Sequence, residues 1–222
     1  MTNDISHKSL KDQNRWQLWL TIALNTVAFY AVAQSDAIEK TGLHGLLTAV
    51  SNLFPIGFAF ILTSIVNGLL SSVIKARLVF LRWTHALPGH RAFSKHAPAD
   101  PRIDLNRLKK ALGNKLPEGP DAENQAWYRI FKEVEAAPEI QHVHRELLFM
   151  RDYTCIAALC FVGYGITALI IVGPMKAAML YALALLLQVI VVRHVAATYG
   201  ERFVCTVLAV KSAGTVGGAG KR

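Results

Sequence analysis

Histidine side chains are the first candidates for chemistry, and most of them lie in the middle of the chain. Five of the eight histidines fall between residues 75 and 153: His85, His90, His96, His142 and His144. The His142-x-His144 spacing cannot place both rings on one helix face, because positions two apart diverge. The same stretch contains no cysteine that could complete a zinc site. We therefore expect surface or interfacial histidines, no metal site and no cofactor.

The carboxylates Asp100 and Asp104, in the segment DPRID, have the look of a paired-acid motif. Aspartate before proline is a turn signal, however, and Asp104 is well placed to cap a following helix, so we expect structural roles for both. The sequence also lacks the G-x-S-x-G, phosphate-loop and H-E-x-x-H motifs. A membrane enzyme acting on lipid would need clustered acids or histidines at helix ends, where only Asp152 and His194 come near. We expect no catalytic residue and no enzyme.

A run of cations in the central region is the first feature that stands out. The candidate anion-sensing residues in it are Arg91, Lys95, Arg102, Arg107, Lys109 and Lys110. Such a run could bind a nucleotide, a nucleic acid or a phospholipid headgroup, with Phe93, Trp127 or Tyr128 stacking on a base. The alternative is the ordinary excess of positive charge on the cytosolic side of a membrane protein, with Trp127 in a small core.

The second feature is a polar stripe within an otherwise apolar segment, residues 53–74. Its candidate pore-lining residues are Thr63, Ser64, Asn67 and Ser71, and the candidate helix-packing residues are Gly68 and Ser72, with Gly163 from a later segment. Small residues four apart let helices approach closely, so the stripe could simply pack helices within one chain. A water-filled pore is the other interpretation. It would require a homo-oligomer, since four helices of one chain enclose no useful conduit.

The elements that carry these residues are predicted to be membrane helices. The chain is 53% hydrophobic and 18% charged, and residues 53–74 contain no charge. At about 1.5 Å per residue, such a run crosses a hydrocarbon core of about 30 Å. Residues 16–34 form a further uncharged run. Its Ala31-Val32-Ala33 also fits a signal-peptide cleavage site, but the apolar run is long for that role.

We predict an all-α fold with four transmembrane helices and a small helical cytosolic insert between the second and third. The expected parts are residues 1–74 with two spans, the basic insert 75–153, a hairpin 154–192 turning at Gly173-Pro174, and a C-terminal helix and tail, 193–222. Residues 76–83 should prolong the second helix beyond the membrane. Insert helices should begin at Asp104, Asp121 and Pro138, the last continuing into the third span.

The distribution of basic residues predicts the topology. Of the 24 lysines and arginines, 22 fall in the N-terminal segment, the insert and the C-terminal region, and only Lys40 and Lys176 fall in the opposite connectors. Four spans place those three regions on one side, which the positive-inside rule assigns to the cytosol. A three-span arrangement would split the basic residues between both faces. We expect an inner-membrane protein with both termini cytoplasmic.

The stretches AFSKHAPADPRID, ENQAWYRIFKEVE and RELLFMRDYTCIAAL resemble small bacterial four-span membrane effectors of antiphage defence loci. The resemblance is one of layout and covers the insert and the start of the third span. It implies an oligomeric channel or pore that is regulated, through the basic insert, by a nucleotide, nucleic-acid or protein signal. The alternative is a non-conducting membrane scaffold whose insert docks a cytosolic partner protein.

Overall fold

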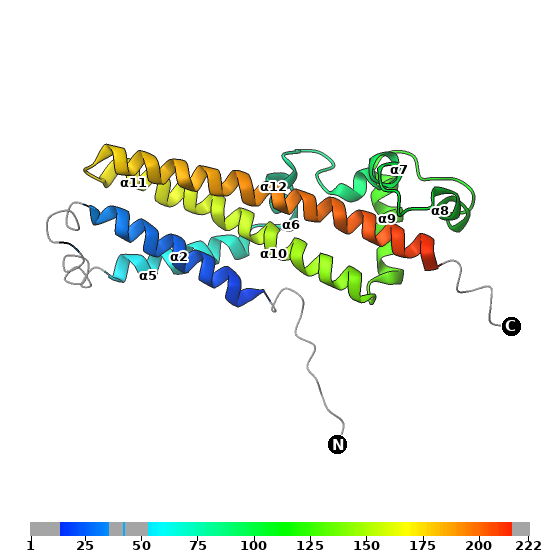
Figure 1. Ribbon diagram of the computed structural model, residues 1–222, viewed down its shortest axis with the longest axis horizontal. Helices are drawn as coiled ribbons and strands as arrows, with labels where there is room; N and C mark the ends of the chain where they lie inside the picture. Colours follow the sequence, from blue (N-terminus) through cyan, green and yellow to red (C-terminus); the bar gives the residue numbers. More distant parts are fainter. Residues whose placement is uncertain (1–13, 36–41, 43–52, 215–222) are drawn as a thin grey trace, which may run out of the picture. The chain divides into compact units, whose positions relative to one another are not determined.

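The computed structural model describes residues 14–35, 42 and 53–214, and the described residues form helices and turns without any strand. The helices are α2 (Arg15–Ala33), α5 (Leu53–Leu69), α6 (Ser72–Phe80), η2 (Pro88–Arg91), η3 (Ala92–His96), α7 (Ala97–Ala99), α8 (Leu105–Ala111), α9 (Pro120–Val134), α10 (Pro138–Cys160), η4 (Phe161–Gly165), α11 (Ile166–Ile171) and α12 (Met175–Gly214) (Figure 1). The predicted all-α class is confirmed. The N-terminal segment, most of the first connector with Lys40, and the C-terminal tail lie outside the described residues.

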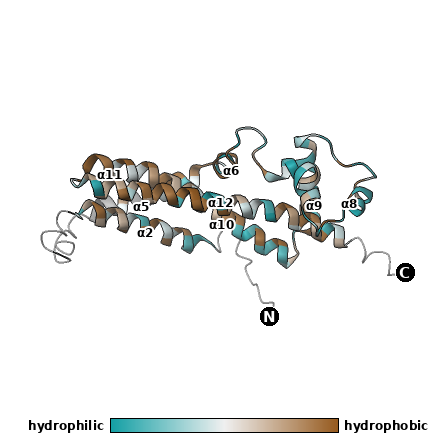
Figure 2. Cartoon of the chain, turned by 45° about the horizontal axis from the view of Figure 1, so that its top comes forward, coloured by the Kyte–Doolittle hydropathy of each residue, from teal (hydrophilic) through white to brown (hydrophobic). Residues whose placement is uncertain are grey.

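Three helices are long and apolar enough to cross a membrane, and a fourth crossing is added if the bent pair α5–α6 counts as one. The three are α2, the continuous stretch Pro138–Ile171 and α12. Figure 2 shows the apolar colouring concentrated on α5, α11 and the first half of α12. The chain is therefore a membrane-embedded helical protein.

The chain divides into two compact units. The first contains residues 1–75 and 149–194, and the second contains residues 76–148 and 195–222. Helices α6, α10 and α12 contribute residues to both. The second unit thus joins the central insert to the C-terminal helix, which the sequence suggested as a separate part.

The first unit is a bundle of the apolar helices. In Figure 1, α2 and the α10–α11 stretch run in one direction, while α5 and α12 run in the other. Its buried core includes Ile22, Ile156, Tyr164 and Leu185. Many large apolar side chains remain exposed around it, among them Leu24, Ile65, Ile170, Leu183 and Ile190. An apolar exterior of this kind fits lipid better than water.

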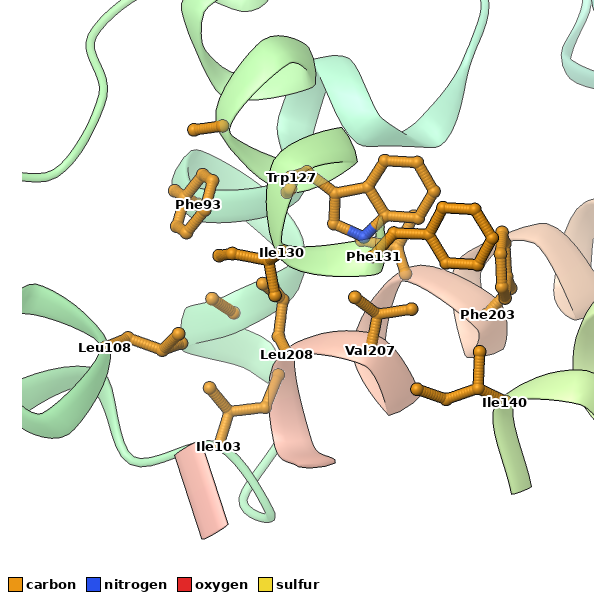
Figure 3. Close-up of a cluster of buried hydrophobic side chains, with 14 of the residues drawn as sticks. Phe93, Ile103, Leu108, Trp127, Ile130, Phe131, Ile140, Phe203, Val207 and Leu208 are labelled. Atoms are coloured by element: carbon orange, nitrogen blue, oxygen red, sulfur yellow. The ribbon is translucent and has the colours of Figure 1, made fainter. Parts of the chain in front are cut away.

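The second unit has its own hydrophobic core, drawn in Figure 3. Trp127 stacks on Phe131 from the same helix, with ring centroids 5.7 Å apart, and Phe203 of α12 meets both rings edge-on. Leu108 and Ile140 are fully buried, which places α8 and α10 against the same core. Trp127 thus lies in a small core, as one of the two interpretations of the basic region expected.

Several predicted helix boundaries agree with the structure, and two do not. Asp104 caps α8 by accepting a hydrogen bond from the Arg107 amide at 3.0 Å, and Pro138 opens α10, which continues through η4 and α11. Helix α9 begins at Pro120, so Asp121 lies in its first turn and is not the cap. The larger error concerns residues 76–83, because α6 ends at Phe80 and does not prolong α5 in line.

Candidate functional site

The most unusual backbone feature of the first unit is a sharp break in the second apolar segment. Helix α5 ends at Leu69, α6 begins at Ser72, and the two helices are bent by 96°. The Ile74 amide donates a hydrogen bond to Ser71 Oγ at 3.3 Å, and the Lys75 amide donates to the Ser71 carbonyl at 3.1 Å. Ser71 therefore caps the N-terminus of α6. Serine and glycine near the break are typical of kinked helices.

Directly after the break lies a buried ion pair. Lys75 Nζ is 3.0 Å from Asp152 Oδ1, and the two side chains are only 4% and 2% exposed. Arg151 adds a second cation, with Nη2 at 3.3 Å from the same oxygen and a side chain 22% exposed. Burying charges in this way is costly unless the partners stay together. The pair therefore holds α6 against α10 inside the first unit.

A hydroxyl cluster joins three helices in the interior of the first unit. The Tyr164 hydroxyl, within η4, lies 2.9 Å from Thr26 Oγ1 of α2 and 3.5 Å from Thr63 Oγ1 of α5. Phe29 stacks on the Tyr164 ring with centroids 5.1 Å apart. Element η4 is a π-helical turn, a feature that often occurs where a helix serves a function. Thr63, a candidate pore-lining residue, thus faces other helices of its own chain.

Two other candidate pore-lining residues on α5, Ser64 and Asn67, each have a side-chain oxygen that makes no hydrogen bond to a described residue. Ser64 Oγ and Asn67 Oδ1 are enclosed atoms with no hydrogen-bond partner among the described residues. Both residues as a whole are only partly buried. A polar oxygen without a partner costs about 1–3 kcal/mol even in a protein interior. Of the four predicted pore-lining residues, these two therefore have an oxygen without a partner in the part of the chain that the structure describes.

The three candidate packing residues are exposed. Gly68, Ser72 and Gly163 all lie on the surface, and a Cβ atom added to either glycine would meet no atom within 4 Å. Within the described residues, therefore, no helix of the same chain packs closely against either glycine.

Three of the six candidate anion-sensing side chains in the second unit have acidic partners. Arg102 and Asp100 form a bidentate pair, with the closest atoms 2.7 Å apart. Lys95 lies 3.5 Å from Glu201, and Arg107 lies 3.0 Å from Asp104. Lys109 and Lys110 are exposed on α8. The structure does not gather the six cations into one site.

The electrostatics of this surface follow from those pairs. The hydrogen bond from Arg102 lowers the pKa of Asp100 to about 2. Burial lowers the pKa of Arg91, and the nearby Arg82 lowers it further. Burial also lowers the pKa of His96, whose enclosed Nε2 has no partner in the described part of the chain. His96 is therefore neutral near pH 7 and adds no charge to the surface.

A hollow of about 520 Å³ lies on the same surface. Its lining contains basic and acidic side chains, including Lys95, His96, Asp100, Arg102, Glu201 and Arg202. Arg202 comes from α12 and was not among the sequence candidates. It is far from the basic run in the sequence, so the sequence alone does not indicate that Arg202 lies beside Lys95 and Arg102. The acids in this hollow balance much of its positive charge, so it is a weaker anion site than the linear run of cations suggested.

Sequence reasoning also missed a buried carboxylate. Glu123 is 4% exposed, and its Oε2 accepts hydrogen bonds from the Phe93 and Ser94 amides at 2.8 and 3.0 Å. The carboxylate thus fixes the start of η3 on α9. Glutamate in the first turn of a helix is common, and nothing in the local sequence distinguishes this one.

Across residues 14–35, 42 and 53–214, no group of three or more histidine, cysteine, aspartate or glutamate side chains is arranged to hold a metal ion. Comparisons with protein-family models, with curated proteins and with solved structures find no match to this chain.

Proposed function

We propose that this protein is an oligomeric membrane channel or pore-type effector whose conductance is controlled through its second unit. The observation that carries the proposal is a pair of oxygens on α5, Ser64 Oγ and Asn67 Oδ1, that have no hydrogen-bond partner among the described residues. Hydrocarbon offers no substitute partner, so polar residues inside membrane helices generally mark ion or water pathways. A side-chain rotation in these partly exposed residues could bring both oxygens to water or to a second copy.

Self-association is supported by the exposed small residues. Gly68 and Ser72 lie on either side of the α5–α6 break, and both are exposed. Small residues exposed on a membrane helix let a second helix approach closely. Because one bundle encloses no conduit, conduction requires several copies arranged around an axis.

The proposed topology places both termini and the second unit in the cytosol, with an even number of crossings. Support comes from the charge distribution and from the alternating directions of α2, α5, α10–α11 and α12 in Figure 1. A bacterial inner membrane and a role in antiphage defence are proposed on the resemblance of the sequence alone. The same resemblance is the basis for proposing that a nucleotide, nucleic-acid or protein signal acts on the second unit. The exposed Lys109 and Lys110 could contact that signal.

The test is ion flux through liposomes that contain the purified protein. We expect Asn67→Leu to abolish flux while leaving membrane insertion intact, and Ile65→Leu, at an exposed position two residues earlier on α5, to leave flux unchanged. Lys109→Glu with Lys110→Glu should alter regulation and not basal conductance. Absence of flux from a correctly inserted oligomer, under every condition that activates the protein in cells, would remove the channel proposal.

A second candidate function is a non-conducting membrane scaffold. The observation that favours it is the separate aromatic core of the second unit, which makes that unit a folded domain able to present a stable surface. In that case the purified protein passes no current, and the second unit retains a specific cytosolic protein. A pull-down performed beside the flux assay separates the two functions.

A further inference from the structure

The segment that follows α6 exposes apolar side chains that a water-facing surface rarely carries. Trp83 is 81% exposed and Leu81 is 67% exposed. The Arg77 guanidinium lies over the Trp83 ring, 5.9 Å from its centroid. Tryptophan beside arginine, at the end of a membrane helix, is the usual composition of the lipid headgroup region.

The backbone of this segment supports the same conclusion. Leu81 has a φ of 50°, in the left-handed region that leucine rarely adopts. Such a conformation is unfavourable for a residue with a Cβ atom. Here the strained residue also leaves 67% of its surface exposed. A contact with an apolar layer outside the protein would offset both.

Chain connectivity places that layer close by. Helix α5 ends at Leu69, and α6 leaves it at 96°. A helix that turns through about a right angle where a membrane crossing ends will run along the bilayer surface. Trp83 follows the end of α6 by three residues, so it cannot lie far from the leaflet in which α5 ends.

The charge of the segment indicates which lipids it would meet. Residues 40–99 contain no aspartate or glutamate, while Arg77 and Arg82 flank the exposed leucine and tryptophan, and both are exposed. Basic residues near a membrane surface are attracted to anionic lipids. Neutral lipids would provide only the apolar part of this attraction.

We propose that residues 77–83 lie in the headgroup layer of the leaflet in which α5 ends and bind anionic phospholipid there. Leu81 and Trp83 insert beside the upper acyl chains, and Arg77 and Arg82 contact the phosphates. This anchor fixes the direction of α6 relative to the bilayer. It does not depend on whether the protein conducts ions or on which face of the membrane is cytosolic.

Tryptophan fluorescence in bilayers containing brominated lipids tests the proposal. The variant Trp16→Phe/Trp19→Phe keeps Trp83 and Trp127, and a further Trp83→Phe change leaves only Trp127, which is buried in the second unit. The difference between the spectra of these two variants is the emission of Trp83, and neither variant changes the aromatic core of the second unit. We expect blue-shifted Trp83 emission that bromines near the headgroup quench strongly and bromines near the chain ends quench weakly.

The charged part is tested with and without anionic lipid in the bilayer. Arg77→Gln/Arg82→Gln should abolish the increase in Trp83 quenching that anionic lipid produces, whereas Lys109→Gln/Lys110→Gln should preserve it. Trp83 emission at the wavelength of exposed tryptophan, quenched by aqueous iodide equally in micelles and in bilayers, would overturn the proposal. That result would point to a protein partner for this surface instead.

Discussion

Lys75 and Asp152 lie 3.0 Å apart at their charged atoms, and both side chains are almost completely buried. Their positions differ by 77 in the sequence, yet the pair fixes the first turns of α6 against α10. The pair therefore lies at the one place where the second apolar segment changes direction. Whatever the membrane unit does, movement of α6 away from α10 must first separate these two charges.

Asp152→Asn is expected to destabilise the protein by about 3–5 kcal/mol, because it leaves the Lys75 ammonium buried without its carboxylate. Arg151→Gln should cost much less, since the arginine is partly exposed and Lys75 keeps its partner. Unfolding of the detergent-solubilised protein measures both. Equal stabilities of Asp152→Asn and the parent protein would show that the two charges are not held together in solution.

Ser71 was predicted to line a pore, and in the structure it caps α6. Ser71→Ala should therefore cost about 1 kcal/mol of stability, the usual value of a serine cap, and Ser71→Asp should restore most of it. Ser72→Ala, one residue later and exposed, serves as the matched control and should be neutral. If Ser71→Ala changed the conductance but not the stability, the pore-lining assignment would regain support.

Tyr164→Phe removes the hydroxyl that joins α2, η4 and α5. We expect a loss of about 0.5–1.5 kcal/mol, because Thr26 Oγ1 still donates to the Ile22 carbonyl and is not left unsatisfied. Tyr128→Phe, at a half-exposed position of α9, should have no effect. Thermal unfolding in micelles distinguishes the two variants. A cost similar for both tyrosines would indicate that the hydroxyl cluster contributes nothing.

Composition and helix-start signals were sufficient to predict most of the long helices. The uncharged run before Ser35 predicted α2, Asp104 predicted the start of α8, and Pro138 predicted the start of α10. These features are local, so they can be read from neighbouring residues. The C-terminal half of α12 joins the same core through Phe203 and Leu208, a long-range contact that local spacing does not reveal.

The break after Leu69 and the ion pairs were not predictable for a related reason. Ser71 and Ser72 are as compatible with a continuous helix as with a kink, and the choice is made by tertiary contacts such as the Lys75–Asp152 pair. In the same way, the six candidate cations formed one group in the sequence. The structure pairs Lys95 with Glu201, more than a hundred residues away, so net charge along the chain overstates the positive field on the surface.

Asp100 provides a prediction about pH. Its pKa is lowered from the ordinary 3.8 to about 2, chiefly by the hydrogen bond from Arg102. A carboxyl whose pKa is lower in the folded state stabilises the protein fully above pH 3.8 and loses that contribution as the pH falls toward 2. Because the Arg102 side chain is 55% exposed, solvent screening limits the contribution to less than about 1 kcal/mol.

Arg102→Gln should return the pKa of Asp100 toward 3.8, which a carbon-13 NMR titration of the labelled carboxyl would follow in the micelle-bound protein. Arg107→Gln provides the matched control, since Arg107 pairs with Asp104 and leaves the bidentate contact intact. The acid-induced loss of stability should then begin at the same pH in the control and the parent. An Asp100 carboxyl that titrates near 3.8 in the parent protein would mean that Arg102 is free in solution, and the anion-sensing role predicted for Arg102 would become more plausible.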